Sequence, residues 1–194
     1  MRIPTGAALA AGAAPTTATS SAVASASSRS LSGEKILRAV KDAGVEYVLS
    51  VPDLHTSEGV LKRVVADNEL KLVRVCKEDE CFGIAAGLTY GDKRSLILIQ
   101  YTGFLYAMNA IRAIACEHSM PMVMMIGLLS KEVDVAPRAS KKFGVAITEP
   151  MLDVLGITQH YIDTDDDIAR IKPAIEKAYA TSTPVALLIG RRPV

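Results

Sequence analysis

From residue 32 onward, apolar positions follow two distinct patterns along the chain. One repeats at helical spacing and predicts helices at 32–44, 56–65, 78–90, 104–117, 151–155 and 167–181. The other is a short continuous apolar run and predicts strands at 45–51, 70–76, 95–100, 121–127, 159–162 and 185–189. Ser32 is expected to cap the first helix and Gly44 to end it.

Strands that are apolar along their whole length, and that alternate with helices, are typical of a parallel sheet covered on both faces. We therefore predict an α/β fold with a doubly wound parallel sheet and helices on both faces. The pattern does not reveal the order of the strands. A chain of 194 residues is long enough for one such domain, while two would be crowded.

Residues 1–31 have a different composition, rich in Ala, Ser, Thr, Gly and Pro, with no acidic residue before Glu34. Such a segment buries too little apolar area to offset the entropy of ordering it, so we predict a low-complexity tail at 1–31 and a single domain at 32–194. An organellar transit peptide is the alternative, although only Arg2 and Arg29 are charged. The expected location is the cytoplasm, or an organelle if the tail is a transit peptide.

Charge and cysteine content exclude several classes of protein. A net charge of +1 gives no electrostatic reason to bind nucleic acid or anionic membranes. The longest apolar run, at 121–129, is far shorter than the ~20 residues that span a bilayer. Cys76, Cys81 and Cys116 form no CxxC pair, which indicates neither a disulfide framework nor a zinc site. We expect a soluble protein from a reducing compartment.

Candidate chemistry gathers where the predicted strands end, because ligands of open parallel sheets bind beyond the carboxyl ends of the strands. Asp53 and His55 follow the first strand, Glu78 the second and Thr102 the third. Each also has a structural explanation: Glu78 could stabilise the start of a helix, Thr102 could be a helix cap, and His55 could bind its own loop. No GxGxxG, GxxxxGK[ST] or GxSxG motif is present, which argues against dinucleotide and nucleoside triphosphate binding and against a hydrolase elbow.

Residues 77–87, KEDECFGIAAG, resemble the pyrimidine-binding domains of thiamine diphosphate enzymes. In that family a glutamate follows the second strand and an Ala-Gly pair lies in the next helix. The glutamate lies nine positions before the helix glycine, and the spacing from Gly87 points to Glu78 rather than Glu80.

Several further segments, in the same order along the chain, are similar to the sulfopyruvate and phosphonopyruvate decarboxylases of this family. They are residues 51–53, 98–103, Asn109, 119–122 and 152–157. The resemblance extends from about Glu34 to the C-terminus and implies a decarboxylase of small 2-oxoacids.

The resemblance implies that Glu78 is the acid that activates thiamine diphosphate. A carboxyl group bonded to the pyrimidine ring favours the tautomer whose nitrogen removes a proton from the thiazolium carbon. The other expected site residues follow strands at the same edge of the sheet. They are Asp53 and His55 as proton relays, Thr102 and Gly103 as cofactor contacts, and Tyr101 and Arg138 as substrate contacts.

Arg138 is a candidate because it lies in a basic loop with Lys131, Lys141 and Lys142, and a guanidinium can pair with a sulfonate, phosphonate or second carboxylate. A solvated loop, or one that docks on a partner, is the alternative. Tyr101 stands where the relatives usually have Asn, so the identity of the oxoacid stays open.

The family binds the diphosphate and Mg²⁺ through a Gly-Asp-Gly run followed by paired Asn. Here Gly91-Asp92 is followed by Lys93 and no paired Asn exists, so no metal ligand is expected in this chain. The resemblance then implies a hetero-oligomer in which a β subunit holds Mg²⁺ and the diphosphate. The helix at 104–116, apolar on nearly every face, fits burial against a partner or wholly within the domain.

The expected function is therefore the α subunit of a two-subunit decarboxylase that releases an aldehyde and carbon dioxide. Two alternatives stay open. One is a thiamine-dependent carboligase or acyl-transfer subunit. The other is a non-catalytic α/β subunit that regulates its partner.

Overall fold

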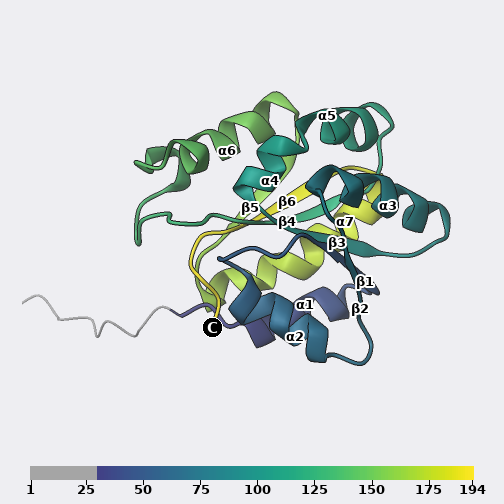
Figure 1. Cartoon of the computed structure of the whole chain (residues 1–194), viewed down its shortest axis with the longest axis horizontal. Helices are drawn as coiled ribbons and strands as arrows, with labels where there is room; N and C mark the ends of the chain where they lie inside the picture. The colour runs from purple at the N-terminus through teal and green to yellow at the C-terminus, as the bar shows by residue number, and fades with distance from the viewer. Residues whose placement is uncertain (1–29) are drawn as a thin grey trace, which may run out of the picture.

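The computed structural model describes residues 30–194, which form one central sheet with helices on both faces (Figure 1). All six strands are parallel and follow the order β2-β1-β3-β4-β6-β5. The strands are β1 (Tyr47–Ser50), β2 (Lys71–Arg74), β3 (Ser95–Gln100), β4 (Val123–Gly127), β5 (Thr158–Ile162) and β6 (Val185–Ile189). The predicted doubly wound α/β sheet is confirmed.

The helices form two layers. On one face lie α1 (Gly33–Asp42), η1 (Ser57–Leu61), α2 (Lys62–Ala66), η4 (Asp165–Arg170) and α7 (Ile171–Thr181). On the other lie α3 (Glu78–Tyr90), α4 (Tyr101–Tyr106), α5 (Met108–Ala110), η2 (Ile111–Glu117), η3 (Pro137–Ala139) and α6 (Phe143–Val154).

Each layer has its own apolar core. Successive residues of a strand point to opposite faces of a sheet. Leu96 and Leu98 of β3 therefore pack with α1, α2 and α7, whereas Ile97 and Ile99 pack with the opposite layer. The buried residues are mainly Leu, Ile, Val, Met and Ala, as expected for a chain without Trp.

Two predicted helices differ from those observed. The short helix predicted at 151–155 is the end of α6, which begins eight residues earlier and contains Pro150. Proline normally ends a helix, but burial of Val145, Thr148 and Leu152 holds α6 together across it. The long helix predicted at 104–117 begins at Tyr101 and is divided into α4, α5 and η2.

The first described residues are part of the packed domain. Leu31 is buried in the core, and its carbonyl oxygen accepts a hydrogen bond from the Val194 N–H at 2.9 Å. Ser32 caps α1 by accepting a hydrogen bond from Lys35 N, and Gly44 has a φ of +76°, so both predictions at this helix are confirmed. The rest of the predicted tail, residues 1–29, lies outside the described residues.

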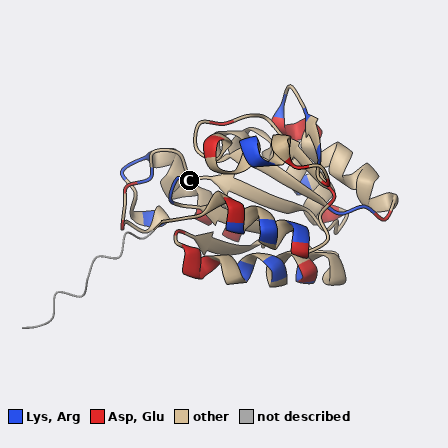
Figure 2. Cartoon of the chain, turned by 90° about the horizontal axis from the view of Figure 1, so that it is seen from below, with Lys and Arg blue, Asp and Glu red and all other residues tan. Residues whose placement is uncertain are grey.

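Positively and negatively charged residues are interspersed along the helices of the α1 and α7 layer (Figure 2), and they include the ion pairs Arg38–Glu34 and Lys172–Glu176. Within residues 30–194, none of the helices has the length and hydropathy needed to cross a membrane.

The strand order reverses at two places, and these determine where ligands can bind. Between β1 and β3, the chain leaves β1 toward η1 and leaves β3 toward α4, on the opposite face. Between β4 and β6, the chain leaves β4 toward η3 and α6. After β6 it turns to the opposite face, where Pro193 packs against Gly59 of η1. Crevices of open parallel sheets form at such reversals, at the carboxyl ends of the strands.

Candidate active site

Glu78 is the first residue of α3, half-buried, and its side chain lies across the backbone of Gly103 at the start of α4. A Cβ atom placed on Gly103 would be 2.4 Å from Glu78 Cγ and 2.5 Å from Glu78 Oε1. These separations are too short for non-bonded atoms, so only glycine at 103 leaves room for the glutamate in this position. The structure thus brings together two residues that the sequence assigned to the cofactor site.

The neighbouring Glu80 caps the start of α3. Its Oε2 accepts hydrogen bonds from the backbone N–H groups of Cys76 at 2.9 Å and Lys77 at 3.3 Å, as a residue at the third helical position does in a capping box. The Glu78 carboxylate accepts no hydrogen bond from any described residue of the chain. Glu80 therefore supplies the hydrogen bonds that cap α3, and the Glu78 carboxylate is left available to a ligand.

Asp53 is buried in the loop after β1 and holds that loop in shape. One carboxylate oxygen accepts hydrogen bonds from His55 N at 2.5 Å and Thr56 N at 2.7 Å, and the other accepts one from Thr56 Oγ1 at 2.6 Å. These three bonds explain why Asp is needed there. They give Asp53 a structural role, and its predicted role as a proton relay stays a prediction.

His55 lies over the end of β4, where a Cβ on Gly127 would be 3.2 Å from His55 Cβ. The residue is only 5% exposed. Burial lowers the pKa of His55, while the Asp53 carboxylate and a hydrogen bond to the backbone of Ile189 raise it by less. Nε2 is buried and has no hydrogen-bond partner among the described residues. The imidazole is therefore neutral near pH 7, with one ring nitrogen left without a hydrogen-bond partner.

Thr102 and Tyr101 occupy the first turn of α4. Thr102 is exposed and its hydroxyl donates to Gln100 Oε1 at 2.9 Å; Gln100 is the N-cap residue, so the alternative that Thr102 caps this helix is wrong. The Tyr101 ring is half-buried and lies against Gly144 of α6. Both residues remain beside Gly103, and their contacts with cofactor and substrate stay predictions.

Arg138 is tied to α6. Its Nε lies 3.2 Å from Glu149 Oε2, and its Nη2 lies 2.5 Å from Asp153 Oδ2. The side chain is half-exposed, and the paired carboxylates raise the pKa of the guanidinium. These ion pairs fasten η3 to α6, so the structure lends no support to the predicted contact between Arg138 and a substrate.

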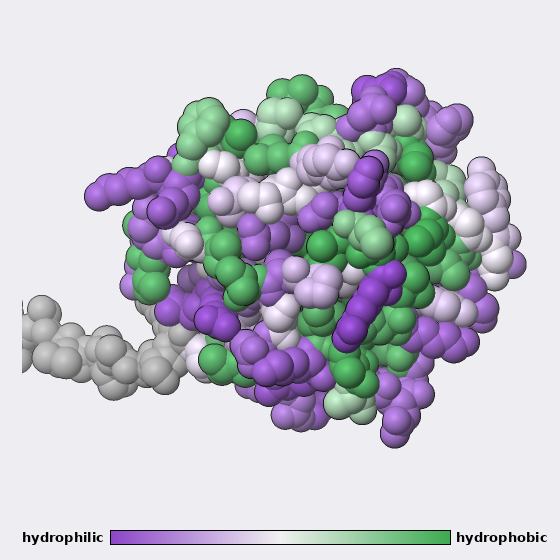
Figure 3. Space-filling model, viewed as in Figure 1, coloured by the Kyte–Doolittle hydropathy of each residue, from purple (hydrophilic) through white to green (hydrophobic). Residues whose placement is uncertain are grey.

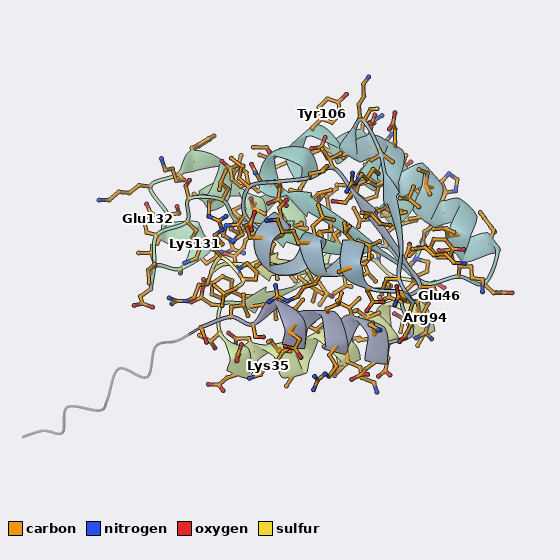
Figure 4. The ribbon with its side chains drawn as sticks, turned by 60° about the horizontal axis from the view of Figure 1, so that its bottom comes forward. Lys35, Glu46, Arg94, Tyr106, Lys131 and Glu132 are labelled. Carbon is orange, nitrogen blue, oxygen red and sulfur yellow. The ribbon has the colours of Figure 1, made fainter. Side chains whose placement is uncertain are left out.

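A second cluster of polar residues was missed from the sequence. A cavity of about 300 Å³ opens at the carboxyl ends of β4, β5 and β6. It is lined by Leu54, His55, Leu129, Ser130, Lys131, Val133, Asp163, Gly190, Arg191 and Arg192. In Figure 4, Lys131 lies at this edge of the sheet, on the opposite side from Glu46 and Arg94, which precede β1 and β3. Asp163 and Arg191 follow strands, so the same rule that selected Glu78 could have selected them.

In the part of the chain that the structure describes, three or more His, Cys, Asp or Glu side chains nowhere gather in a way that could hold a metal ion. The side chains at this edge include the Glu78 carboxylate, the buried imidazole of His55 and a group of basic residues.

Comparison with known proteins gives two kinds of relative. The chain is 30% identical over 154 residues to the sulfopyruvate decarboxylase subunit alpha of Methanocaldococcus jannaschii, covering 79% of this chain and 89% of that one. It is 27% identical over 158 residues to the subunit of the same name from Methanococcus maripaludis, covering 80% and 92%. No family model matches the chain.

Among solved structures, the crystal structure of benzoylformate decarboxylase from Polynucleobacter necessarius has the same fold. The TM-score is 0.60 at 18% sequence identity over 82% of this chain. The match spans 30% of the benzoylformate decarboxylase chain, so the likeness concerns one part of a longer protein.

Proposed function

Given that this chain belongs to the family of the sulfopyruvate decarboxylase alpha subunits, we propose that it is the α subunit of a two-subunit, thiamine diphosphate-dependent decarboxylase. Its substrate is a small 2-oxoacid of the sulfopyruvate or phosphonopyruvate type, and its products are an aldehyde and carbon dioxide. The observation that carries this proposal is the Glu78 carboxylate, which lies over Gly103 and has no partner in the described chain.

The residues around Glu78 fit a pyrimidine ring. Thiamine diphosphate, when bound, supplies a nucleophilic carbon and an electron sink for the loss of carbon dioxide. Glu78 would hold a proton at its carboxyl group and share it with a ring nitrogen. Its half-buried position against Gly103, next to the buried Phe104 in the chain, limits competition from water. Gly103 would keep the carboxylate in place because no Cβ obstructs it.

A partner subunit would supply Mg²⁺ and the diphosphate site. The outer side of α3 and α4 offers a surface for it: Tyr90 is 82% exposed and Tyr106 is 57% exposed. A Cβ added to Gly83 or Gly87 of α3 would meet no atom within 4 Å, so their side of the helix is open. Figure 3 shows apolar residues emerging among polar ones over this layer. Of the two alternatives for the helix at 104–116, this exposure favours burial against a partner over burial within the domain.

The experiment is co-expression with a candidate β subunit that bears the Gly-Asp-Gly and paired-Asn elements. The purified complex should contain thiamine diphosphate and Mg²⁺ and should release carbon dioxide and an aldehyde from sulfopyruvate or phosphonopyruvate. The chain alone should be inactive even with added cofactor and Mg²⁺. The complex carrying Glu78→Gln is the matched control.

Three results would contradict the proposal. Turnover by the isolated chain would show that the active site is not divided between subunits. A stable complex without bound cofactor would favour a regulatory subunit. Condensation products in place of the free aldehyde would favour a carboligase.

A further inference from the structure

The cavity between β4 and β6 is basic. Lys131, Arg191 and Arg192 line it together with one acid, Asp163. It lies at the second reversal of the strand order, whereas Gly103 follows β3. Because neighbouring strands are about 4.8 Å apart, two strand steps separate β3 from β6 by roughly 10 Å. The cavity therefore adjoins the region of Glu78 without including it.

Asp163 cannot neutralise the basic groups around it. It accepts a hydrogen bond from Tyr161 Oη at 2.8 Å, and its carboxylate lies 3.4 Å from Arg191 Nη2 and 4.0 Å from Lys131 Nζ. The Lys131 side chain is 1% exposed, and Nζ also donates to the carbonyl oxygens of Glu132 at 2.6 Å and Val135 at 2.8 Å. Arg191 Nη2 also lies 3.3 Å from Asp134 Oδ1, so two carboxylates serve Lys131 and Arg191, and the charge of Arg192 is the one that no ion pair within the described chain offsets.

Two further polar groups in the cavity, Arg192 and Nε2 of His55, have no hydrogen-bond partner within the described chain, and Arg192 interacts electrostatically with the Glu58 carboxylate. Arg192 is exposed at the rim and makes no ion pair or hydrogen bond with another described residue. His55 Nε2 has no hydrogen-bond partner either, and it belongs to a residue that is only 5% exposed. A buried polar atom without a partner is rare in proteins and marks a place where a bound group is expected.

We propose that this cavity binds the distal acidic group of the substrate, an oxyanion such as a sulfonate, phosphonate or carboxylate. Arg192 and Arg191 supply charge and donors, and His55 supplies an N–H donor when its ring is protonated beside the anion. Leu54, Leu129 and Val133 line the rest of the cavity and exclude water from the pair. The assignment of the anion to a substrate rests on the proposed function; the anion site itself does not.

The first test measures anion binding without turnover. Thermal unfolding of the full chain is followed with methanesulfonate, and with uncharged methanesulfonamide, at constant ionic strength. Methanesulfonate should raise the Tm because it binds the folded state, and methanesulfonamide should not. Arg192→Gln should abolish the rise. Arg38→Gln, which removes an exposed arginine of α1, should keep it. No rise in the wild type, or the same rise in Arg192→Gln, would overturn the anion site.

The second test compares two substrates in the complex with the partner subunit. Arg192→Gln should lower kcat/KM for sulfopyruvate by about tenfold or more, equivalent to about 1.4 kcal/mol. It should change kcat/KM for pyruvate, whose tail is an uncharged methyl group, by less than about twofold, since only an acidic tail interacts with the arginine. Equal effects on both substrates would overturn the substrate assignment and leave a site for a free oxyanion. An Arg192-dependent rise in Tm with no turnover of any oxoacid would contradict the proposed function and support the anion site.

Discussion

The carboxyl group of Glu78 occupies the space that a side chain at Gly103 would fill. Gly103→Ala should therefore displace the glutamate, and we expect turnover to fall by about two orders of magnitude, the lower end of what general acid–base catalysis contributes. The fold should tolerate the change, because the obstructing atoms belong to a flexible side chain and Ala is favoured over Gly within a helix by about 0.5–1 kcal/mol. Steady-state kinetics and thermal unfolding of the same preparation measure both effects.

Gly91→Ala is the matched control for that variant. Gly91 follows α3, and the nearest atom to a Cβ at this position is 3.4 Å away, an ordinary contact. It should leave turnover unchanged. If Gly103→Ala and Gly91→Ala behaved alike, the contact with Glu78 would have no catalytic importance.

Glu78 and Glu80 should separate catalysis from stability. Glu78→Gln should keep the fold and lower kcat by about two or more orders of magnitude. Glu80→Ala should keep most of the activity and lower the free energy of unfolding by about 1 kcal/mol, since it removes the acceptor for two backbone N–H groups before α3. Urea unfolding and kinetics on both variants decide the assignment, which a loss of activity confined to Glu80→Ala would reverse.

Asp53 should act through the shape of its loop. Asp53→Ala leaves two buried backbone N–H groups without an acceptor and should cost about 1–3 kcal/mol of stability. Asp53→Asn keeps an oxygen for those donors, so both stability and activity should stay close to the wild type. A large loss of kcat in Asp53→Asn with an unchanged Tm would instead favour the proton relay.

His55 should make stability depend on pH in a particular window. Its pKa in the folded chain lies below the ordinary value of 6.5, mainly because burial disfavours the charged ring. The unfolded chain therefore takes up protons more readily. The stabilisation is fully present above pH 6.5 and is lost as the pH falls below it. His55→Gln should make the fall in stability between pH 7 and pH 5 shallower.

In His55→Gln, the fall in stability that remains between pH 7 and pH 5 should come from His160. Burial also lowers the pKa of that residue. His118→Gln, which removes an exposed histidine after η2, is measured alongside as the control for the substitution itself. Chemical unfolding at a series of pH values measures the slope. The same slope in the wild type and His55→Gln would mean that the ring is not held in its neutral form.

The sequence predicted α3, β3 and β6 with their observed bounds because each is a buried apolar segment with clear boundary residues. It missed the first two turns of α6, since Pro150 resembles a helix end and only burial against the rest of the domain overrides it. Local patterns carry no information on strand order, which depends on contacts between distant segments.

The residues of the candidate site could likewise be predicted where they depend on local features of the sequence, and not where they depend on contacts between distant segments. Glu78 and Gly103 could be found because each follows a strand and the spacing to Gly87 is a local feature. Arg138 was selected for its guanidinium and its place in a basic loop, and its pairing with Asp153, 15 residues away, could not be seen in the sequence. Asp163 and Arg191 lie 28 residues apart and meet because they follow β5 and β6, which are neighbouring strands. No sequence window contains that information.

The residues of the two sites also lie in different segments of the chain, one before β4 and one after it. Glu78 and Gly103 precede β4, whereas Lys131, Asp163, Arg191 and Arg192 all follow it. A chimaera joined between β3 and β4 would take the cofactor-activating acid from one parent and most of the basic cavity from the other. During evolution, substitutions after β4 alone could thus change which 2-oxoacid the enzyme prefers. The segment before β4, with Glu78 and Gly103, would stay unchanged.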